Sequence, residues 1–218
     1  ASVDVTFSPT SVDTGKTASI EFVHDGANGT QTASLTGDGI AFVEFLLCVN
    51  AGGSAVPTTS LGRSFVADSA TYYDTAGSLF DKLGTPIAGT TDDVLFQTER
   101  YATSLGYSIP VPAPGEYTVD LYFAELYFGA PGNGSDGGVG SRVFDIVVQD
   151  LMFYNNFDPV AAAGGSGAAV VRSALVTVLD GNPLKIELQR QVGNPSIKGI
   201  EVLAQDVATT LTLNTPQG

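Results

Sequence analysis

The sequence predicts an all-β fold, an antiparallel β-sandwich with jelly-roll-like connections. Short apolar runs that alternate with polar residues recur along the chain, and no long segment repeats its apolar residues with a helical period. Charged residues make up only 15% of the chain and 26 of its 218 residues are Gly, which disfavours long surface helices with charged faces. Hydrophobic residues make up 43%, enough for a packed core.

The predicted strands follow one another along the whole chain. Residues 3–7, 17–24 and 30–36 come first, and residues 25–29 (DGANG) read as a hairpin turn between the second and third strands. Stronger strand patterns follow at residues 42–49, 94–98, 117–127, 143–148, 170–178, 184–188 and 197–203. Residues 69–83 lack a clear alternating pattern, so short helical turns are expected there.

These strands are predicted to fall into a partial β unit at residues 1–40, a sandwich at 41–205 and a C-terminal strand or tail at 206–218. Three strands at the start of the chain cannot bury both faces of a sheet. Upstream sequence, the chain's own tail or a strand from a neighbouring subunit would have to complete them. The tail alternates Thr and Leu at residues 210–213 and reads as one more free strand.

The charge and composition exclude several classes of function. The formal net charge is −14, which argues against a nucleic-acid partner held by phosphate contacts and against anionic membranes. No stretch is long and apolar enough to be inserted in a membrane. One Cys (Cys48) and one His (His24) rule out an intrachain disulfide and a Cys/His zinc site. No metal or cofactor is expected, and Cys48, flanked by apolar residues, is expected to be a small buried hydrophobe.

Ordered motifs cover residues 44–204. They include VNAGG (49–53), FVAD (65–68), DVLFQTERY (93–101), GYSIPV (106–111), YTVDLYFAELYF (117–128), RVFDI (142–146), NFD (156–158) and NPSIKGIEV (194–202). This part of the chain resembles a malectin-like carbohydrate-binding domain. The resemblance implies a β-sandwich that binds sugars with the loops at one end, without catalysis.

The resemblance also implies which residues would hold the sugar. Aromatic rings stack on the C–H groups of sugars while amides and carboxylates bind the hydroxyls. The matching positions are Tyr101, Tyr127, Phe128, Phe80 (with Tyr73 as the alternative to Phe80) and Asn194. The family's acidic residue falls on Gly193, a loss for which Asp136 is the candidate replacement. Packing at the edge of the sandwich is the competing interpretation of Tyr127 and Phe128.

An enzyme is the least favoured class. Glu99, Glu125, Asp145 and Asp158 are the carboxylates that a glycosidase would need as a pair, but in the family pattern Glu99 and Glu125 are structural. A Ser-His-Asp triad is excluded because His24 lies outside the sandwich.

Residues 1–40 resemble the C-terminal half of a hydin-like, Ig-type domain through VTFSPT (5–10), IEFVHDG (20–26) and SLTGDGI (34–40). Two functions therefore stay open. One is a noncatalytic extracellular module that recognises a glycan. The other is a structural subunit of an extracellular fibre, in which a neighbour's C-terminal strand is added to the incomplete N-terminal unit. Glycosylation triplets at Asn28 and Asn133 give weak further support for secretion to the extracellular space or cell surface.

Overall fold

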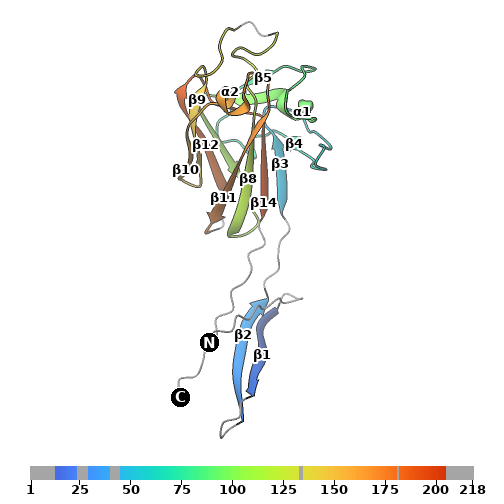
Figure 1. The fold of residues 1–218 in the computed structure, drawn as a ribbon, viewed down its shortest axis with the longest axis vertical. Helices are drawn as coiled ribbons and strands as arrows, with labels where there is room; N and C mark the ends of the chain where they lie inside the picture. Colours follow the sequence, from blue (N-terminus) through green and yellow to red (C-terminus); the bar gives the residue numbers. More distant parts are fainter. Residues whose placement is uncertain (1–12, 24–28, 40–44, 133–134, 181, 205–218) are drawn as a thin grey trace. The chain divides into compact units, whose positions relative to one another are not determined.

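The computed structural model describes residues 13–23, 29–39, 45–132, 135–180 and 182–204 (Figure 1). These residues divide into two units, a β-hairpin and a larger β-sandwich. The predicted strand at residues 3–7, the triplets at Asn28 and Asn133, and the predicted tail strand lie outside the described residues. Among the described residues, no helix has the length and apolar character needed to cross a membrane.

The hairpin consists of β1 (Asp13–Val23) and β2 (Thr30–Gly39). The two strands pair antiparallel from Val23↔Thr30 to Lys16↔Gly37, and the register shifts between Asp13 and Lys16. They form a two-stranded sheet, the kind of sheet that is marginally stable by itself. The Ig-type origin of this unit stays a prediction.

The sandwich has two main sheets. The five-stranded sheet runs in the order β11 (Val170–Val178), β8 (Gly115–Phe123), β14 (Gly199–Ala204), β3 (Leu46–Asn50) and β4 (Val66–Ala67). The four-stranded sheet runs β10 (Leu151–Phe157), β9 (Val143–Val148), β12 (Leu184–Val192) and β7 (Ser104–Ile109). All pairs are antiparallel except β3 with β4. The predicted fold class, an all-β antiparallel sandwich, is confirmed.

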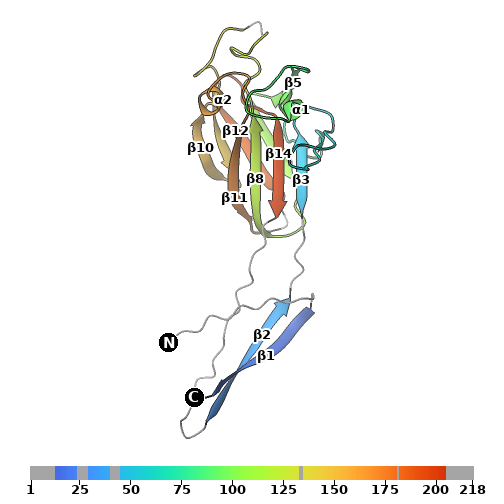
Figure 2. The same cartoon turned by 45° about the vertical axis from the view of Figure 1, so that its right-hand side comes forward.

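A third, smaller sheet lies at one end of the sandwich, where Figures 1 and 2 place the two short helices as well. Its order is β13 (Ser196–Ile197), β6 (Thr98–Tyr101) and β5 (Ser78–Asp81). The helices are α1 (Asp93–Phe96) and α2 (Pro159–Ala163). Asp158 caps α2 by accepting hydrogen bonds from two backbone amides at its start.

The core lies between the two main sheets and follows from strand alternation. In β8, Tyr117, Val119 and Leu121 face inward, while Thr118 and Asp120 between them are partly exposed. β12 alternates in the same way through Leu184, Ile186 and Leu188. Both segments were predicted as strands because of this pattern.

A second apolar cluster covers the outer face of the five-stranded sheet. Its members include Cys48, Phe65, Leu95, Phe96 and Tyr122. The loop before β4 supplies Phe65 and helix α1 supplies Leu95 and Phe96, so β3 and the end of β8 are buried on both faces. Cys48 is 3% exposed, which confirms it as a small buried hydrophobe.

Three of the predicted segments differ from the structure. Residues 94–98 were predicted as one strand, but the segment contains helix α1 followed by the first residue of β6. Its adjacent Leu95 and Phe96 are both buried while Val94 is exposed, which fits a helical turn and not a half-buried strand. The segment 117–127 ends as a strand at Phe123, and residues 69–83 contain β5.

Candidate functional site

Aromatic side chains gather at the end of the sandwich that carries β5. Phe80 comes from β5, and Tyr127 and Phe128 follow β8. The rings of Phe80 and Tyr127 meet edge to face at 5.8 Å between centroids, and those of Tyr127 and Phe128 do so at 5.0 Å. Tyr127 is 43% exposed and the other two are half-buried. We call these three residues the aromatic cluster.

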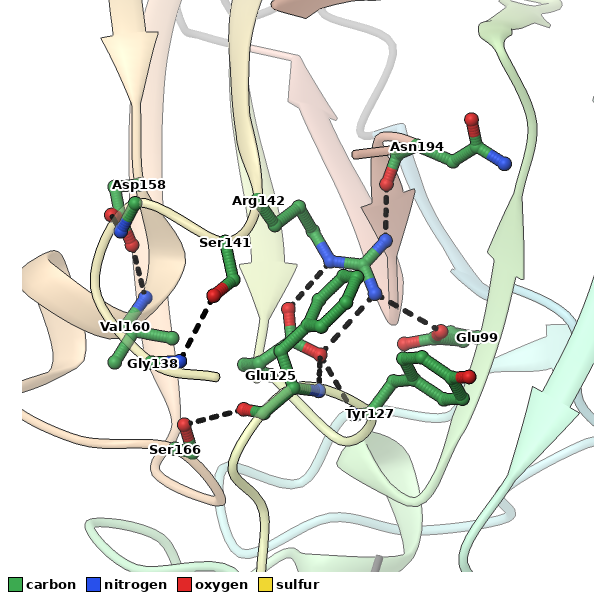
Figure 3. Close-up of polar contacts among 12 residues, drawn as sticks. Glu99, Glu125, Tyr127, Gly138, Ser141, Arg142, Asp158, Val160, Ser166 and Asn194 are labelled. Carbon is green, nitrogen blue, oxygen red and sulfur yellow. Dashed lines mark hydrogen bonds and ion pairs between the residues drawn. The ribbon is translucent and has the colours of Figure 1, made fainter. Parts of the chain in front are cut away.

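Tyr101 and Asn194 lie on neighbouring segments. Tyr101 ends β6 and pairs with Ser78 of β5, while Glu99 pairs with Phe80. Residues opposite one another and two apart share a face, so Tyr101 projects from the same face of the small sheet as Phe80. In Figure 3 the amide of Asn194 points away from Arg142, to which Asn194 offers its backbone oxygen.

Tyr73 belongs to a different cluster. The guanidinium carbon of Arg100 lies 3.8 Å from the centroid of the Tyr73 ring. Arg100 is also paired with Asp68 at 2.7 Å. Phe80 and Tyr73 were the two candidates for one of the sugar-binding aromatic positions. Phe80 packs on Tyr127, whereas Tyr73 covers Arg100.

A buried carboxylate holds the backbone of Tyr127 and Phe128. One oxygen of Glu125, Oε1, accepts hydrogen bonds from the amides of Tyr127 (2.7 Å) and Phe128 (3.0 Å). Arg142 donates to the same carboxylate through Nε (2.5 Å) and Nη2 (3.2 Å), and its guanidinium lies 5.3 Å from the Phe128 ring centroid. Figure 3 shows this arrangement. Because two consecutive amides share one acceptor, the turn that presents both rings is fixed.

A second ion pair lies beside the first. Lys198, between β13 and β14, is fully buried and pairs with Glu99 of β6. Arg142 Nη2 lies 3.9 Å from Glu99 Oε1, so two cations and two carboxylates form one buried network. Burial lowers the pKa of Lys198 despite the opposing charge of Glu99. The sequence contained no sign that Arg142 and Lys198 would share Glu99, because Arg142 precedes β9 and Lys198 lies between β13 and β14.

The network keeps Glu125 ionised. Burial acts to raise the pKa of Glu125, but the hydrogen bonds and charge of Arg142 and the two backbone amides outweigh it and lower the pKa. The other carboxylates considered for catalysis are also engaged. Asp145 accepts from the amide of Asn156 (2.7 Å), and Asp158 caps α2 and accepts from the amide of Gly140 (2.6 Å).

The glycine-rich loop after Phe128 is tied down at several points. Ser166 donates to the carbonyl of Phe128 (2.8 Å), Gly129 donates its amide to the carbonyl of Ser135 (3.0 Å), and Gly138 donates to Ser141 Oγ (3.0 Å). Two of these bonds are drawn in Figure 3. Asp136 is exposed within this loop, and among the described residues its carboxylate forms no hydrogen bond with the aromatic cluster.

Gly193 lies close to Phe128 and needs to be glycine. Its φ is +63°, a backbone conformation that favours glycine. A Cβ at this position would lie 2.7 Å from the carbonyl oxygen of Ser141 and 3.5 Å from the Phe128 ring. The backbone here is thus incompatible with the acidic residue that the family pattern places at this position.

Within the described ranges, no three His, Cys, Asp or Glu side chains come together in a way that would hold a metal ion.

The comparisons with known proteins agree with the resemblance of residues 44–204 to a malectin-like domain. The model of the malectin domain matches residues 45–200. Receptor-like protein 4 of Arabidopsis thaliana is 36% identical over 113 residues, and Malectin-B of Xenopus laevis is 40% identical over 78 residues. The matches cover 50% and 35% of this chain but only 17% and 25% of those proteins.

Solved structures share the fold at low sequence identity. The ANX2 ectodomain from Arabidopsis thaliana superposes with a TM-score of 0.63 at 17% identity, over 80% of this chain and 51% of that one. This likeness supports the architecture of the sandwich.

Proposed function

Because the chain belongs to the malectin domain family, we propose that its sandwich is a noncatalytic extracellular module that binds a glycan. The observation that carries the proposal is the aromatic cluster, in which the exposed ring of Tyr127 is braced by Phe80 and Phe128. An exposed ring that neighbouring rings hold in place is a platform for the C–H face of a sugar. Tyr101 and Asn194 are the neighbouring side chains proposed to extend it.

The ion network supports binding without catalysis. A glycosidase needs one carboxyl group as a proton donor and a second as nucleophile or base. Glu125 has a lowered pKa and accepts four hydrogen bonds, and Glu99 is paired with the buried Lys198. Both carboxylates therefore hold the loops in position and neither is available as an acid.

A glycan array with the 218-residue chain tests the proposal, followed by titration calorimetry on each glycan that binds. Tyr127→Ala is expected to weaken binding at least tenfold, which is about 1.4 kcal/mol, with little change in unfolding temperature because the ring is partly exposed. Phe153→Ala, which removes a half-buried ring from β10, is the matched control and leaves the affinity unchanged. Binding that persists in Tyr127→Ala, or an array without any bound glycan, contradicts the proposal.

The second candidate is a structural subunit of an extracellular assembly. The observation that favours it is the hairpin, whose strands of 11 and 10 residues form a sheet of only two strands among the described residues. A strand supplied by a neighbouring copy would give the hairpin a third member and join the copies head to tail.

Negative-stain microscopy and light scattering on the full chain, repeated without residues 207–218, test this second candidate. Fibres that disappear on truncation support it. A monodisperse monomer in both cases rules it out and leaves the glycan-binding proposal standing.

A further inference from the structure

Strand β11 forms one edge of the five-stranded sheet. It pairs with β8 along its whole length, from Val170↔Phe123 to Val178↔Gly115. On its other side, the part of the chain that the structure describes places no strand (Figures 1 and 2). Its sequence, VVRSALVTV, contains no Pro and no Lys, two of the residues that protect sheet edges from pairing, and its one charged residue is Arg172. A nine-residue edge of this kind offers its free backbone groups to another strand.

A groove of about 680 Å³ opens at the start of the same strand. Val170 and Val171 form one wall, and Leu61 on the opposite loop is 74% exposed. The floor is made by three aromatic side chains, which are Phe65, Phe96 and Tyr122. Val171 pairs with Tyr122 across the strands, so the groove lies on the outer face of the sheet, beside the free edge. It is large enough to admit a bulky apolar side chain.

The neighbouring residue, Arg172, lies on the other face. It pairs with Leu121, a core residue, and its guanidinium lies 5.4 Å from the ring centroids of both Tyr154 and Phe157. Its Nη1 donates a hydrogen bond to the carbonyl oxygen of Val171 (3.0 Å), while its Nε is buried without a hydrogen-bond partner among the described residues. Within those residues the side chain forms no ion pair. Arg190 also forms no ion pair within the described residues, but it is exposed, whereas Arg172 is partly buried against two aromatic rings. The side chain of Arg172 as a whole is partly exposed, so an acidic group from outside can pair with the terminal nitrogens of its guanidinium.

We propose that β11 binds an extended segment of a partner protein as an added strand, through a bulky apolar residue that sits next to an acidic one. Consecutive residues of a strand point to opposite faces. One dipeptide therefore places its apolar side chain in the groove beside Val171 and its carboxylate opposite Arg172. The backbone bonds supply affinity, and these two side chains supply specificity. This site is separate from the aromatic cluster and involves no sugar.

The probe is the acetylated and amidated peptide TVTFEVTVT, titrated into the full chain with chemical shifts of β11 amides as the readout. We expect saturable binding. Arg172→Glu is expected to weaken binding at least tenfold, and replacing the peptide's glutamate with lysine is expected to restore it. Arg190→Glu, an exposed arginine of β12, is the matched control and changes affinity less than twofold.

Two further measurements keep the test independent of the folding of the Arg172 variant. Leu61→Asp, at an exposed wall of the groove, is expected to weaken binding about fivefold. A peptide methylated at alternate backbone nitrogens is expected not to bind. Failure of the unmodified peptide to bind at millimolar concentration overturns the proposal. Binding that survives backbone methylation, or that is unchanged when the charges of residue 172 and of the peptide are exchanged, overturns it as well. Self-association through β11 that excludes the peptide would assign the edge to a second copy and overturn the partner proposed here.

Discussion

Phe80 and Tyr127 pack edge to face with 84° between their ring planes and 5.8 Å between their centroids. One ring comes from a strand of the small sheet, and the other from the turn after β8. The contact thus joins two segments that are far apart in the sequence. It makes the exposed face of Tyr127 a fixed surface.

This contact predicts an energetic coupling between the two rings. In a double-mutant cycle of Phe80→Leu and Tyr127→Leu, the free energy of unfolding in urea is expected to show a coupling of about 0.5 kcal/mol, the lower end for aromatic pairs, because Tyr127 is partly exposed. Effects that add within about 0.3 kcal/mol would show that the rings do not support each other.

The lowered pKa of Glu125 predicts a loss of stability in acid. Because the folded-state pKa lies below the ordinary carboxyl value of 4.5, the unfolded chain takes up this proton first as the pH falls. The contribution of Glu125 is complete above pH 4.5 and is lost as the pH falls through the folded-state pKa.

Urea unfolding of the wild type and Glu125→Gln from pH 7 to pH 3 measures this effect. The wild type is expected to be more stable at pH 7, and the difference is expected to shrink below pH 4.5. A difference that stays constant across this range would mean that Glu125 is not ionised in the fold.

The contribution of Lys198 to the stability of the fold is predicted to depend on the charge of Glu99. Lys198→Met removes the closer of the two cations that face the buried carboxylate of Glu99, leaving Arg142 at 3.9 Å, and is expected to cost about 3–5 kcal/mol. The double variant Glu99→Gln with Lys198→Met removes both charges and is expected to recover most of this loss in the same urea measurement. If the double variant is as unstable as the single one, packing and not charge explains the effect.

Gly193→Asp is predicted to destabilise the protein without improving glycan binding. The aspartate backbone would have to adopt a φ of +63°, and its Cβ would lie too close to the carbonyl oxygen of Ser141. Backbone strain of this kind costs on the order of 1–3 kcal/mol. Thermal unfolding compares this variant with Gly193→Ala, which carries the same strain without the charge. An unfolding temperature equal to that of the wild type would contradict the prediction.

Cys48 is predicted to be unreactive in the folded protein. Burial, reinforced by the charge of Glu201, raises the pKa of its thiol to about 12, so the reactive thiolate is scarce at pH 8. Ellman's reagent is expected to modify it only after unfolding in guanidinium chloride, with the unfolded chain as the control. Rapid reaction of the native protein would show that the cluster around Cys48 opens.

The strands could be predicted where burial alternates cleanly. The bounds 170–178 agree with β11, in which burial alternates because one face meets the core. The bounds 143–148 agree with β9 although its Phe144, Asp145 and Ile146 are all buried. The prediction was wrong at residues 94–98, where Leu95 and Phe96 are buried against the outer face of a sheet. A short apolar run does not show whether it is covered on one face or on both.

The sequence by itself determined the all-β class, the alternating strands of the sandwich and, through its ordered motifs, the malectin resemblance with its candidate aromatics. Only the tertiary structure decided that Phe80 and not Tyr73 meets Tyr127, and that Arg142 and Lys198 neutralise Glu125 and Glu99. It also decided that β11 is the edge strand of its sheet among the described residues and lies beside a groove. The physical reason is the distance along the sequence over which each kind of interaction acts. Alternation and turn chemistry act between near neighbours, whereas ion pairs, ring contacts and strand order join residues that only the folded chain brings together.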